Sequence, residues 1–207
     1  MPFLFDILFP PREDEAALRA VSNDDFLSLL APRLVSVTRP GTIMLLPFSD
    51  TRVRSAIHEA KYHGSRRAFE LLALVLAEYL QDGDVHAPLV IVPIPLGQAR
   101  RHERGFNQTE EIARRALRLL GEEWPHALTL ETDLLKRVRE TVSQVSLPQR
   151  DRGENMRDAF GTTHPINPAC TYMIFDDVLT TGATLQSAIE AMKMAGARHI
   201  IPLTVAH

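Results

Sequence analysis

The chain has 207 residues, of which 45% are hydrophobic and 24% charged, and its formal net charge is -3 at pH 7. This length allows one sizeable core, or one domain with a small appendage, in an ordinary globular protein. The slightly acidic balance disfavours a dedicated nucleic-acid coat protein but permits local basic patches. The single cysteine, Cys170, excludes an internal disulfide and any zinc site built from paired thiolates.

The start of the chain does not resemble a targeting segment. Residues 1–10 are hydrophobic, but they include Asp6 and lack the basic region of a secretory signal peptide. No apolar stretch reaches the roughly 20 residues that are needed to cross a bilayer. Together with the lone cysteine, this predicts a cytoplasmic protein without membrane association.

Residues 1–84 are predicted to form a mainly helical, metal-free segment. Acidic and apolar residues alternate over 13–30, which suits one or two short helices, and 43–46 is a short extended run. Two further helices are predicted after Asp50, the first of them ending at Gly64. The eight histidines of the chain show no metal-ligand spacing, so no metal ligand is assigned.

Residues 85–207 are predicted to form a doubly wound α/β domain with a mostly parallel sheet. The strands expected at 89–92, 172–175 and 199–205 alternate with helices that carry apolar residues at helical spacing. Asn107, with Glu110 three positions on, resembles a capping box at the start of one helix. The short connections imply right-handed parallel crossovers.

The region from Lys136 to Arg157 has a different character. It contains six Lys or Arg against three Asp or Glu, with Pro148 and Gly153, and no sustained apolar period. It is predicted to be a long basic loop, and loops of this length inside a compact domain are usually functional. The alternative is a disordered connector.

The strongest functional pattern lies in residues 174–184. Asp176 and Asp177 directly follow a predicted strand, at the edge where ligands of open α/β sheets bind. The next turn, before a helix, is made of Thr180, Thr181, Gly182, Ala183 and Thr184. Such a turn offers unpaired N–H groups and the positive end of a helix dipole to a phosphate.

Carboxylates beside a phosphate loop are chemically reasonable when they accept hydrogen bonds from sugar hydroxyls. The pattern therefore predicts a site for a phosphorylated sugar. The alternative is that the threonines only cap the helix while Asp176 and Asp177 are solvated strand-end residues. That alternative is the better explanation for any one of these residues taken alone, but a poor explanation for all of them in this order.

This segment resembles the 5-phosphoribosyl-1-diphosphate (PRPP) motif of type I phosphoribosyltransferases. The resemblance implies that Asp176 and Asp177 hold the ribose hydroxyls. It implies that the 5-phosphate is bound by Thr180, Thr181, Gly182, Ala183 and Thr184. It also implies transfer of the phosphoribosyl group to a nitrogen acceptor, with release of diphosphate and a requirement for Mg²⁺.

Other motifs resemble the ComF/GntX branch of that family, over about residues 43–207. They are Val92-Pro93-Ile94-Pro95, Arg104-Gly105-Phe106-Asn107-Gln108, and Lys61-Tyr62-His63-Gly64. The basic loop resembles the mobile hood that closes over PRPP, which makes Arg139 a candidate catalytic residue beside Asp176 and Asp177. Arg104, with Arg100 and Arg101, is a candidate for neutralising diphosphate; the alternative for Arg100 and Arg101 is a solvated basic helix start. Lys61 is interpreted as a helix-end lysine rather than a catalytic residue.

The sequence departs from that branch in one respect. Members usually carry a zinc-binding cysteine cluster after a leader like Leu8-Phe9-Pro10-Pro11-Arg12, whereas Glu13 and Asp14 follow it here. Because the branch is associated with natural transformation, a second hypothesis is a non-catalytic accessory role in DNA uptake, with a protein partner. Direct nucleic-acid binding is less favoured, since only Phe106 and Phe160 lie near the basic segments.

Overall fold

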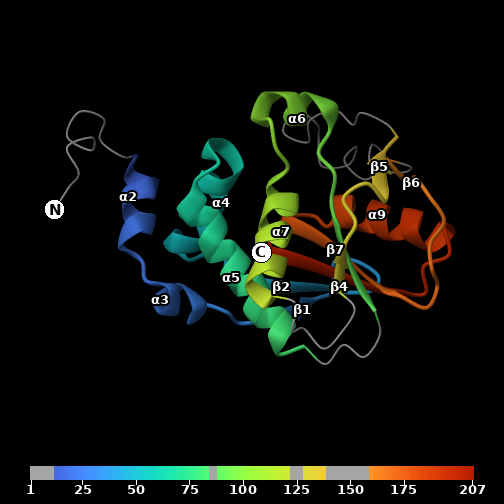
Figure 1. Ribbon diagram of the computed structural model, residues 1–207, viewed down its shortest axis with the longest axis horizontal. Coiled ribbons are helices and arrows are strands. Elements are labelled where there is room, and N and C mark those ends of the chain that lie inside the picture. The colour runs from blue at the N-terminus through green and yellow to red at the C-terminus, as the bar shows by residue number, and fades with distance from the viewer. Residues whose placement is uncertain (1–11, 84–87, 122–127, 139–158) are drawn as a thin grey trace.

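The computed structural model describes residues 12–83, 88–121, 128–138 and 159–207 (Figure 1). Its centre is a six-stranded sheet in which β1 pairs with β2 antiparallel and the other neighbours are parallel. In spatial order the strands are β1 (Arg33–Val35), β2 (Thr42–Leu46), β8 (His199–Ala206), β7 (Thr171–Val178), β3 (Leu89–Pro93) and β4 (Leu128–Leu130). The predicted α/β fold with a mostly parallel sheet is confirmed.

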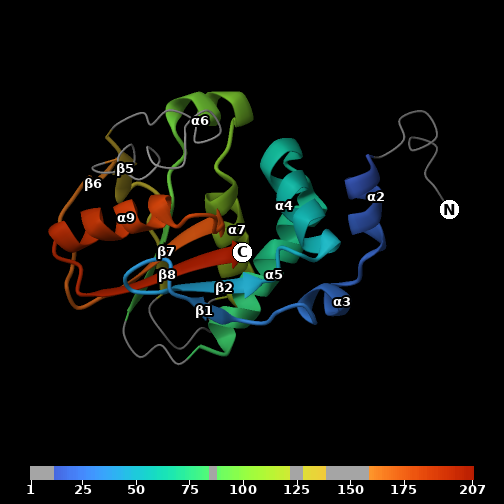
Figure 2. The same cartoon turned by 180° about the vertical axis from the view of Figure 1, so that it is seen from behind.

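Helices cover both faces of the sheet (Figures 1 and 2). One face carries α5 (Arg66–Gln81) and α7 (Gln108–Leu120), with α4 (Thr51–His63) beside α5; α9 (Ala183–Met194) covers the other. The smaller elements are α2 (Glu13–Ala20), α3 (Asn23–Leu27), α6 (Gln98–Arg104), β5 (Leu135–Arg137) and β6 (Phe160–Thr162). Of these, α2 and α3 pack on α4 and α5, and β6, which pairs antiparallel with β5, packs against α9.

The central strands are apolar on both sides because both of their faces are buried. Phe175 and Ile91 point into the core beneath α5 and α7, while Ile174 and Val92 point into the core beneath α9. All four are fully buried. Alternation along β7 therefore assigns each residue of this strand to one helical layer.

Local signals set the ends of the helices next to the site. The Asp50 carboxylate accepts from the Arg52 N–H at 2.8 Å, and Gly64 ends α4 in a left-handed conformation with φ 60°. Asn107 caps α7, as predicted, but Glu110 bonds to Arg114 and no capping-box bond back to Asn107 is made.

Three sequence-based expectations change. Residues 33–46 supply β1 and β2 to the main sheet, and α4 and α5 share its core, so position 84 does not separate two packed units. β7 extends through Val178, so Asp176 and Asp177 lie within the strand rather than after it. The expected loop begins as β5, which pairs with β6, while 139–158 lie outside the described residues.

None of the helices described is both long enough and apolar enough to cross a membrane.

Candidate functional site

The carboxyl ends of β3, β7 and β8 meet at one edge of the sheet. The Ile94 N–H donates to the Phe175 carbonyl at 2.9 Å, which carries the chain beyond β3 alongside the end of β7. The Leu179 N–H donates to the Ala206 carbonyl at 2.8 Å, which ties the segment after β7 to the end of β8. The residues predicted after β3 and β7 are therefore brought to a common edge.

The two aspartates point to opposite sides of the sheet. Successive side chains on a strand alternate between faces, and Phe175 and Ile174 define which face is which. By this alternation Asp177 lies on the side of α4 and α7, and Asp176 on the side of α9. They are neighbours in sequence, but they have different surroundings.

Asp177 is buried and its carboxylate is fully engaged by the protein. Its Oδ2 accepts from Gln108 Nε2 at 2.9 Å and lies 3.1 Å from Lys61 Nζ. Its Oδ1 accepts from the Val178 N–H at 2.8 Å. A buried carboxylate is tolerated when it is paired and hydrogen-bonded in this way.

Asp176 is the more open carboxyl group. Its Oδ1 accepts from the Asp177 N–H at 2.9 Å, and the described residues donate no hydrogen bond to its second oxygen. Shielding from water by the surrounding protein and the nearby charge of Asp177 raise the pKa of Asp176 to about 7, while the hydrogen bond from the Asp177 N–H and the positive charges of Lys61 and Arg137 act to lower it. This carboxyl group is therefore available to a ligand and responsive to pH near neutrality.

The turn of residues 180–184, which the sequence predicts to bind phosphate and which is called the phosphate loop hereafter, leads into α9. Gly182 is the N-cap residue of α9, with φ 76° and ψ -2°. Among the described residues, the backbone N–H groups of Thr180, Thr181 and Gly182 have no hydrogen-bond partner. The Thr181 hydroxyl accepts from the Ala183 N–H at 3.4 Å, and the Thr184 side chain is half-buried in the first turn. Unpaired N–H groups at a helix N-terminus favour an anion.

The phosphate loop is held from behind by the β1–β2 turn. A Cβ atom on Gly182 would lie 3.1 Å from Val37 Cγ2, 3.2 Å from Thr38 Cγ2 and 3.3 Å from the Val37 carbonyl oxygen. The position therefore requires glycine twice, for its left-handed backbone and for this close approach.

The predicted arginines lie in different places. Arg100 and Arg101 are exposed on α6, whereas Arg104 is half-buried: its guanidinium donates to Gln108 Oε1 at 3.1 Å and lies 5.0 Å from the centre of the Tyr62 ring. Arg104 thus adjoins the Asp177 side of the site. Arg139 lies outside the described residues.

Sequence reasoning missed three side chains near the aspartates. Lys61 lies in the last turn of α4, as interpreted, but its side chain is 23% exposed and pairs with the buried Asp177, a contact that the sequence did not indicate. Gln108 bonds Asp177 from the start of α7. Arg137 donates to the Pro95 carbonyl at 3.1 Å and packs over Phe160. The family motif already contained Lys61 and Gln108, but their partner is far away in the sequence.

A second polar cluster joins α2 to α4. Ligand atoms of His58, Glu59 and His63 lie within 4.8 Å of one another, a grouping that the sequence spacing did not indicate. Both oxygens of the fully buried Glu59 accept from the Arg12 guanidinium, at 2.9 and 2.6 Å. Asp14 accepts from Ser55 at 2.6 Å. The bonds from Arg12 pair the buried charge of Glu59 without a metal ion. Together with the bond between Ser55 and Asp14, they dock α2 on α4.

Two surface hollows lie away from the aspartates. One is next to α9 and β6, around Phe160 and Ser187. The other is near the start of β8, around Arg39 and Arg198. Neither hollow includes the phosphate loop. The candidate site consists of the backbone N–H groups of that loop and the Asp176 carboxyl group at the edge of the sheet.

Comparison with known proteins gives relatives that are named competence protein F or DNA utilization protein YhgH. No protein-family model matches the chain. It is 33% identical over 147 residues to the DNA utilization protein YhgH of Escherichia coli (strain K12), covering 68% of this chain and 61% of that protein. It is 29% identical over 137 residues to competence protein F of Haemophilus influenzae, covering 65% of this chain and 57% of that protein. The chain spans about three fifths of the length of these relatives.

A solved structure that resembles the chain is a hypoxanthine phosphoribosyltransferase from Staphylococcus aureus. The TM-score is 0.39 and the sequence identity 18%, over 66% of this chain and 61% of that chain.

Proposed function

Because the chain belongs to the ComF family, we propose that it binds PRPP at the carboxyl edge of its sheet. The observation that carries the proposal is the position of two complementary groups at the end of β7. One is the Asp176 carboxyl group, which has an oxygen free for a ligand. The other is the phosphate loop, with unpaired N–H groups at Thr180, Thr181 and Gly182.

In the proposed complex, Asp176 accepts hydrogen bonds from ribose hydroxyls and the phosphate loop binds the 5-phosphate. Asp177 contributes by fixing this end of β7, because its own oxygens are already occupied. The hydroxyls of Thr180, Thr181 and Thr184 add donors around the phosphate. Ala183 contributes its backbone in the first turn of α9, where the helix dipole favours negative charge.

Mg²⁺ is proposed as the accompanying ion, held by diphosphate and ribose oxygens and by water. This fits the donors at the site, because Mg²⁺ keeps much of its hydration and Asp176 offers a hard anionic oxygen to one of those waters. When bound, the ion supplies charge neutralisation of the diphosphate. Among the described residues, Arg104, which bonds the Asp177 partner Gln108, and Arg137, whose charge acts on Asp176, are proposed to share that role.

The proposed reaction is transfer of the 5-phosphoribosyl group to a nitrogen acceptor. The bond from ribose C1 to the diphosphate oxygen breaks, a bond from C1 to nitrogen forms, and the acceptor nitrogen loses a proton. The chain acts mostly by holding the sugar in place and by stabilising the departing charge. Arg139 belongs to this proposal through family resemblance alone.

Calorimetry with PRPP and Mg²⁺ tests the first step. Wild type should give a heat of binding with PRPP, and Asp176→Asn should lower the affinity for PRPP at least tenfold. Ribose 5-phosphate alone should bind wild type more weakly than PRPP does, through the phosphate loop. Equal heat from wild type and Asp176→Asn, or heat from neither, would show that the assignment is wrong. Labelled PRPP with a panel of nitrogen bases then tests for diphosphate release, and silence across the panel would reject transfer.

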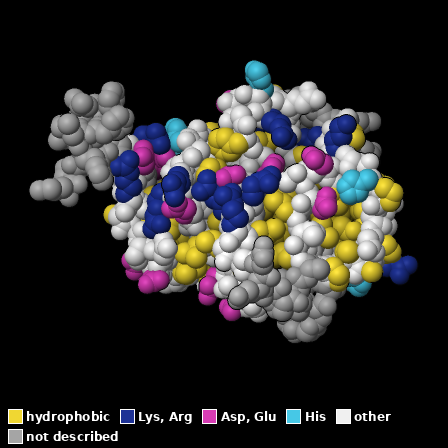
Figure 3. Space-filling model, viewed as in Figure 1, with side chains coloured by type: hydrophobic (Ala, Val, Ile, Leu, Met, Phe, Trp, Pro, Cys, Tyr) yellow, Lys and Arg dark blue, Asp and Glu magenta, His cyan; other side chains and the backbone are white. Residues whose placement is uncertain are grey.

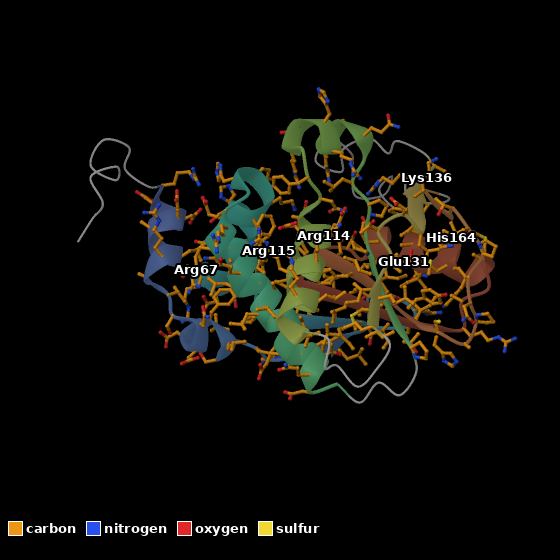
Figure 4. All side chains as sticks on the ribbon, in the orientation of Figure 1. Arg67, Arg114, Arg115, Glu131, Lys136 and His164 are labelled. Carbon is orange, nitrogen blue, oxygen red and sulfur yellow. The ribbon has the colours of Figure 1, made fainter. Side chains whose placement is uncertain are left out.

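A second candidate function is an accessory role in DNA uptake, which the names of the relatives favour. Arg100 and Arg101 are exposed on α6 and make no ion pair among the described residues. The α5 and α7 face is different, because its basic and acidic side chains are interspersed (Figure 3). Arg114 and Arg115, labelled in Figure 4, pair with Glu110 and Glu111 at 2.6 Å. Nucleic acid, if bound, should therefore contact α6.

Fluorescence anisotropy of a labelled single-stranded oligonucleotide tests this candidate. Binding at low salt should weaken as salt rises, and it should weaken further when Arg100 and Arg101 are both replaced by Gln. Replacement of Arg114 and Arg115 is the matched control and should change little. No binding at low salt would leave a protein partner as the remaining form of the accessory role.

A further inference from the structure

Three elements of the fold converge on the Asp177 carboxylate. Lys61 comes from the last turn of α4, Gln108 from the first residue of α7, and the Val178 N–H from β7 itself. Two of these donors share one oxygen, Oδ2, at 3.1 and 2.9 Å. Such convergence on one buried carboxylate holds its orientation firmly and keeps its negative charge compensated.

The neighbours of Lys61 and Gln108 are themselves fixed. Gln108 Oε1 accepts from Arg104 at 3.1 Å, which directs its Nε2 toward Asp177. The Tyr62 ring packs with the Arg104 guanidinium and with the His58 ring, 5.0 Å away in each case. The left-handed Gly64 then ends α4. The last turn of α4 is therefore a rigid support for the Lys61 ammonium.

We propose that Lys61 is a positioning residue of the PRPP site. With Gln108 it holds Asp177 in place as a charged carboxylate, so that Asp176 on the opposite face of β7 is left to accept hydrogen bonds from the ligand. The inference rests on the proposed PRPP binding. It assigns different roles to two aspartates that the family motif treats as one pair.

Charge explains why the lysine is needed. Two adjacent carboxylates repel each other, and the charge of Asp177 disfavours ionisation of Asp176. The groups that face this pair are the ammonium of Lys61, the guanidinium of Arg137 and the carboxylates themselves. Without Lys61, the buried Asp177 keeps one neutral side-chain donor, so both its charge and its orientation are less well supported. Asp176 also loses a positive charge that favours its ionised form.

The test compares Lys61→Met, Lys61→Arg and Lys61→Gln with wild type, by PRPP calorimetry with Mg²⁺ at a series of pH values. Lys61→Met should weaken PRPP binding by about tenfold or more, because a charge-assisted hydrogen bond is lost. Its binding curve should also move to higher pH, since Asp176 then ionises less readily. Lys61→Arg should restore most of the affinity. Arg66→Met is the control, because Arg66 is exposed and, within the described part of the chain, its ion pair is with Glu70.

Thermal melting distinguishes positioning from a general loss of fold. Lys61→Gln keeps a donor and removes the charge, so it serves where Lys61→Met does not fold. A double-mutant cycle with Asp177→Asn tests whether the two residues act through one contact. If they do, the double variant Lys61→Met/Asp177→Asn should bind PRPP no more weakly than the weaker-binding single variant.

The outcomes separate this inference from the proposed function. If wild type binds PRPP while Lys61→Met and Lys61→Gln keep its affinity and its pH profile, the positioning role is overturned and PRPP binding stands. Additive losses in the cycle would also overturn it. If wild type takes up no PRPP at any pH, both the function and the positioning role fail.

Discussion

The glycine at the start of α9 offers a sharp test of how the phosphate loop is held. Gly182 has φ 76° and ψ -2°, and Gly105 at the end of α6 has almost the same conformation, φ 77° and ψ -13°. A Cβ on Gly105 would meet no atom within 4 Å, whereas one on Gly182 would press on Val37 and Thr38. The substitutions Gly105→Ala and Gly182→Ala therefore impose equal backbone strain but different contacts.

The expected cost follows from these two parts. A left-handed alanine loses roughly 1–2 kcal/mol relative to glycine, partly offset by about 0.4–1 kcal/mol from a less flexible unfolded chain. Gly105→Ala should thus destabilise the fold by about 1 kcal/mol. Gly182→Ala adds overpacking of about 1–3 kcal/mol, because the Val37 carbonyl oxygen at 3.3 Å is backbone and cannot rotate away.

Urea unfolding of both variants beside wild type measures the difference. In a parallel thermal melt, each kcal/mol corresponds to roughly 2–4 °C in Tm for a chain of this size. Gly182→Ala should also bind PRPP at least tenfold more weakly, because the N–H groups of the phosphate loop must shift. Equal destabilisation by the two alanines would refute the reasoning, since it would mean that the β1–β2 turn yields to the new methyl group at no cost.

The remaining predictions concern Asp176, Asn107 and Glu59. PRPP binding should strengthen from pH 6 to 8, as Asp176 ionises through its pKa of about 7, and Asp176→Asn should remove that dependence in calorimetry. Folding raises the pKa of Asp176 from 3.8 to about 7, so between these pH values the folded state binds a proton that the unfolded state has lost. Stability should therefore fall as pH rises from about 4 to 7, and the wild-type stability curve should show a drop that Asp176→Asn lacks. Asn107→Ala should cost about 1–2 kcal/mol in urea unfolding, because Asn107 caps α7 and also donates to the Ile94 carbonyl at 3.0 Å. Glu59→Ala should lower the Tm more than Glu70→Ala, since Glu59 is fully buried against Arg12 whereas Glu70 is on the surface; equal shifts would argue against the docking role of the Arg12 pair.

The sequence predicted the long elements of this fold because each carries a pattern of its own. The strands β3, β7 and β8 are apolar runs, and α4, α5, α7 and α9 have apolar residues at helical spacing. The homology confirms the family resemblance that the motifs implied. β1 and β4 were missed because three residues at a sheet edge are too few to show alternation. Their pairing is decided by neighbours that local sequence does not reveal.

Side-chain partners were predicted less well than positions. The sequence placed Asp176 and Asp177 at the correct edge, and strand alternation was a signal that they face opposite sides. It did not reveal that Asp177 is occupied, because its partners Lys61 and Gln108 are 116 and 69 positions away in the sequence. Only the packing of α4 and α7 against β7 brings these groups together.

The position of Lys61 changes how the first half of the chain should be understood. A division at residue 84 would leave the candidate site in the second half alone, yet α4 supplies a contact to its buried aspartate and the β1–β2 turn supports its glycine. The same α4 carries the buried Glu59 that docks α2 through Arg12. One helix therefore links the docking of the N-terminal helices to the orientation of Asp177. A change in how α2 packs on α4 has a structural route to the site through the body of this helix, because Glu59 and Lys61 are two residues apart and point to roughly opposite sides of it.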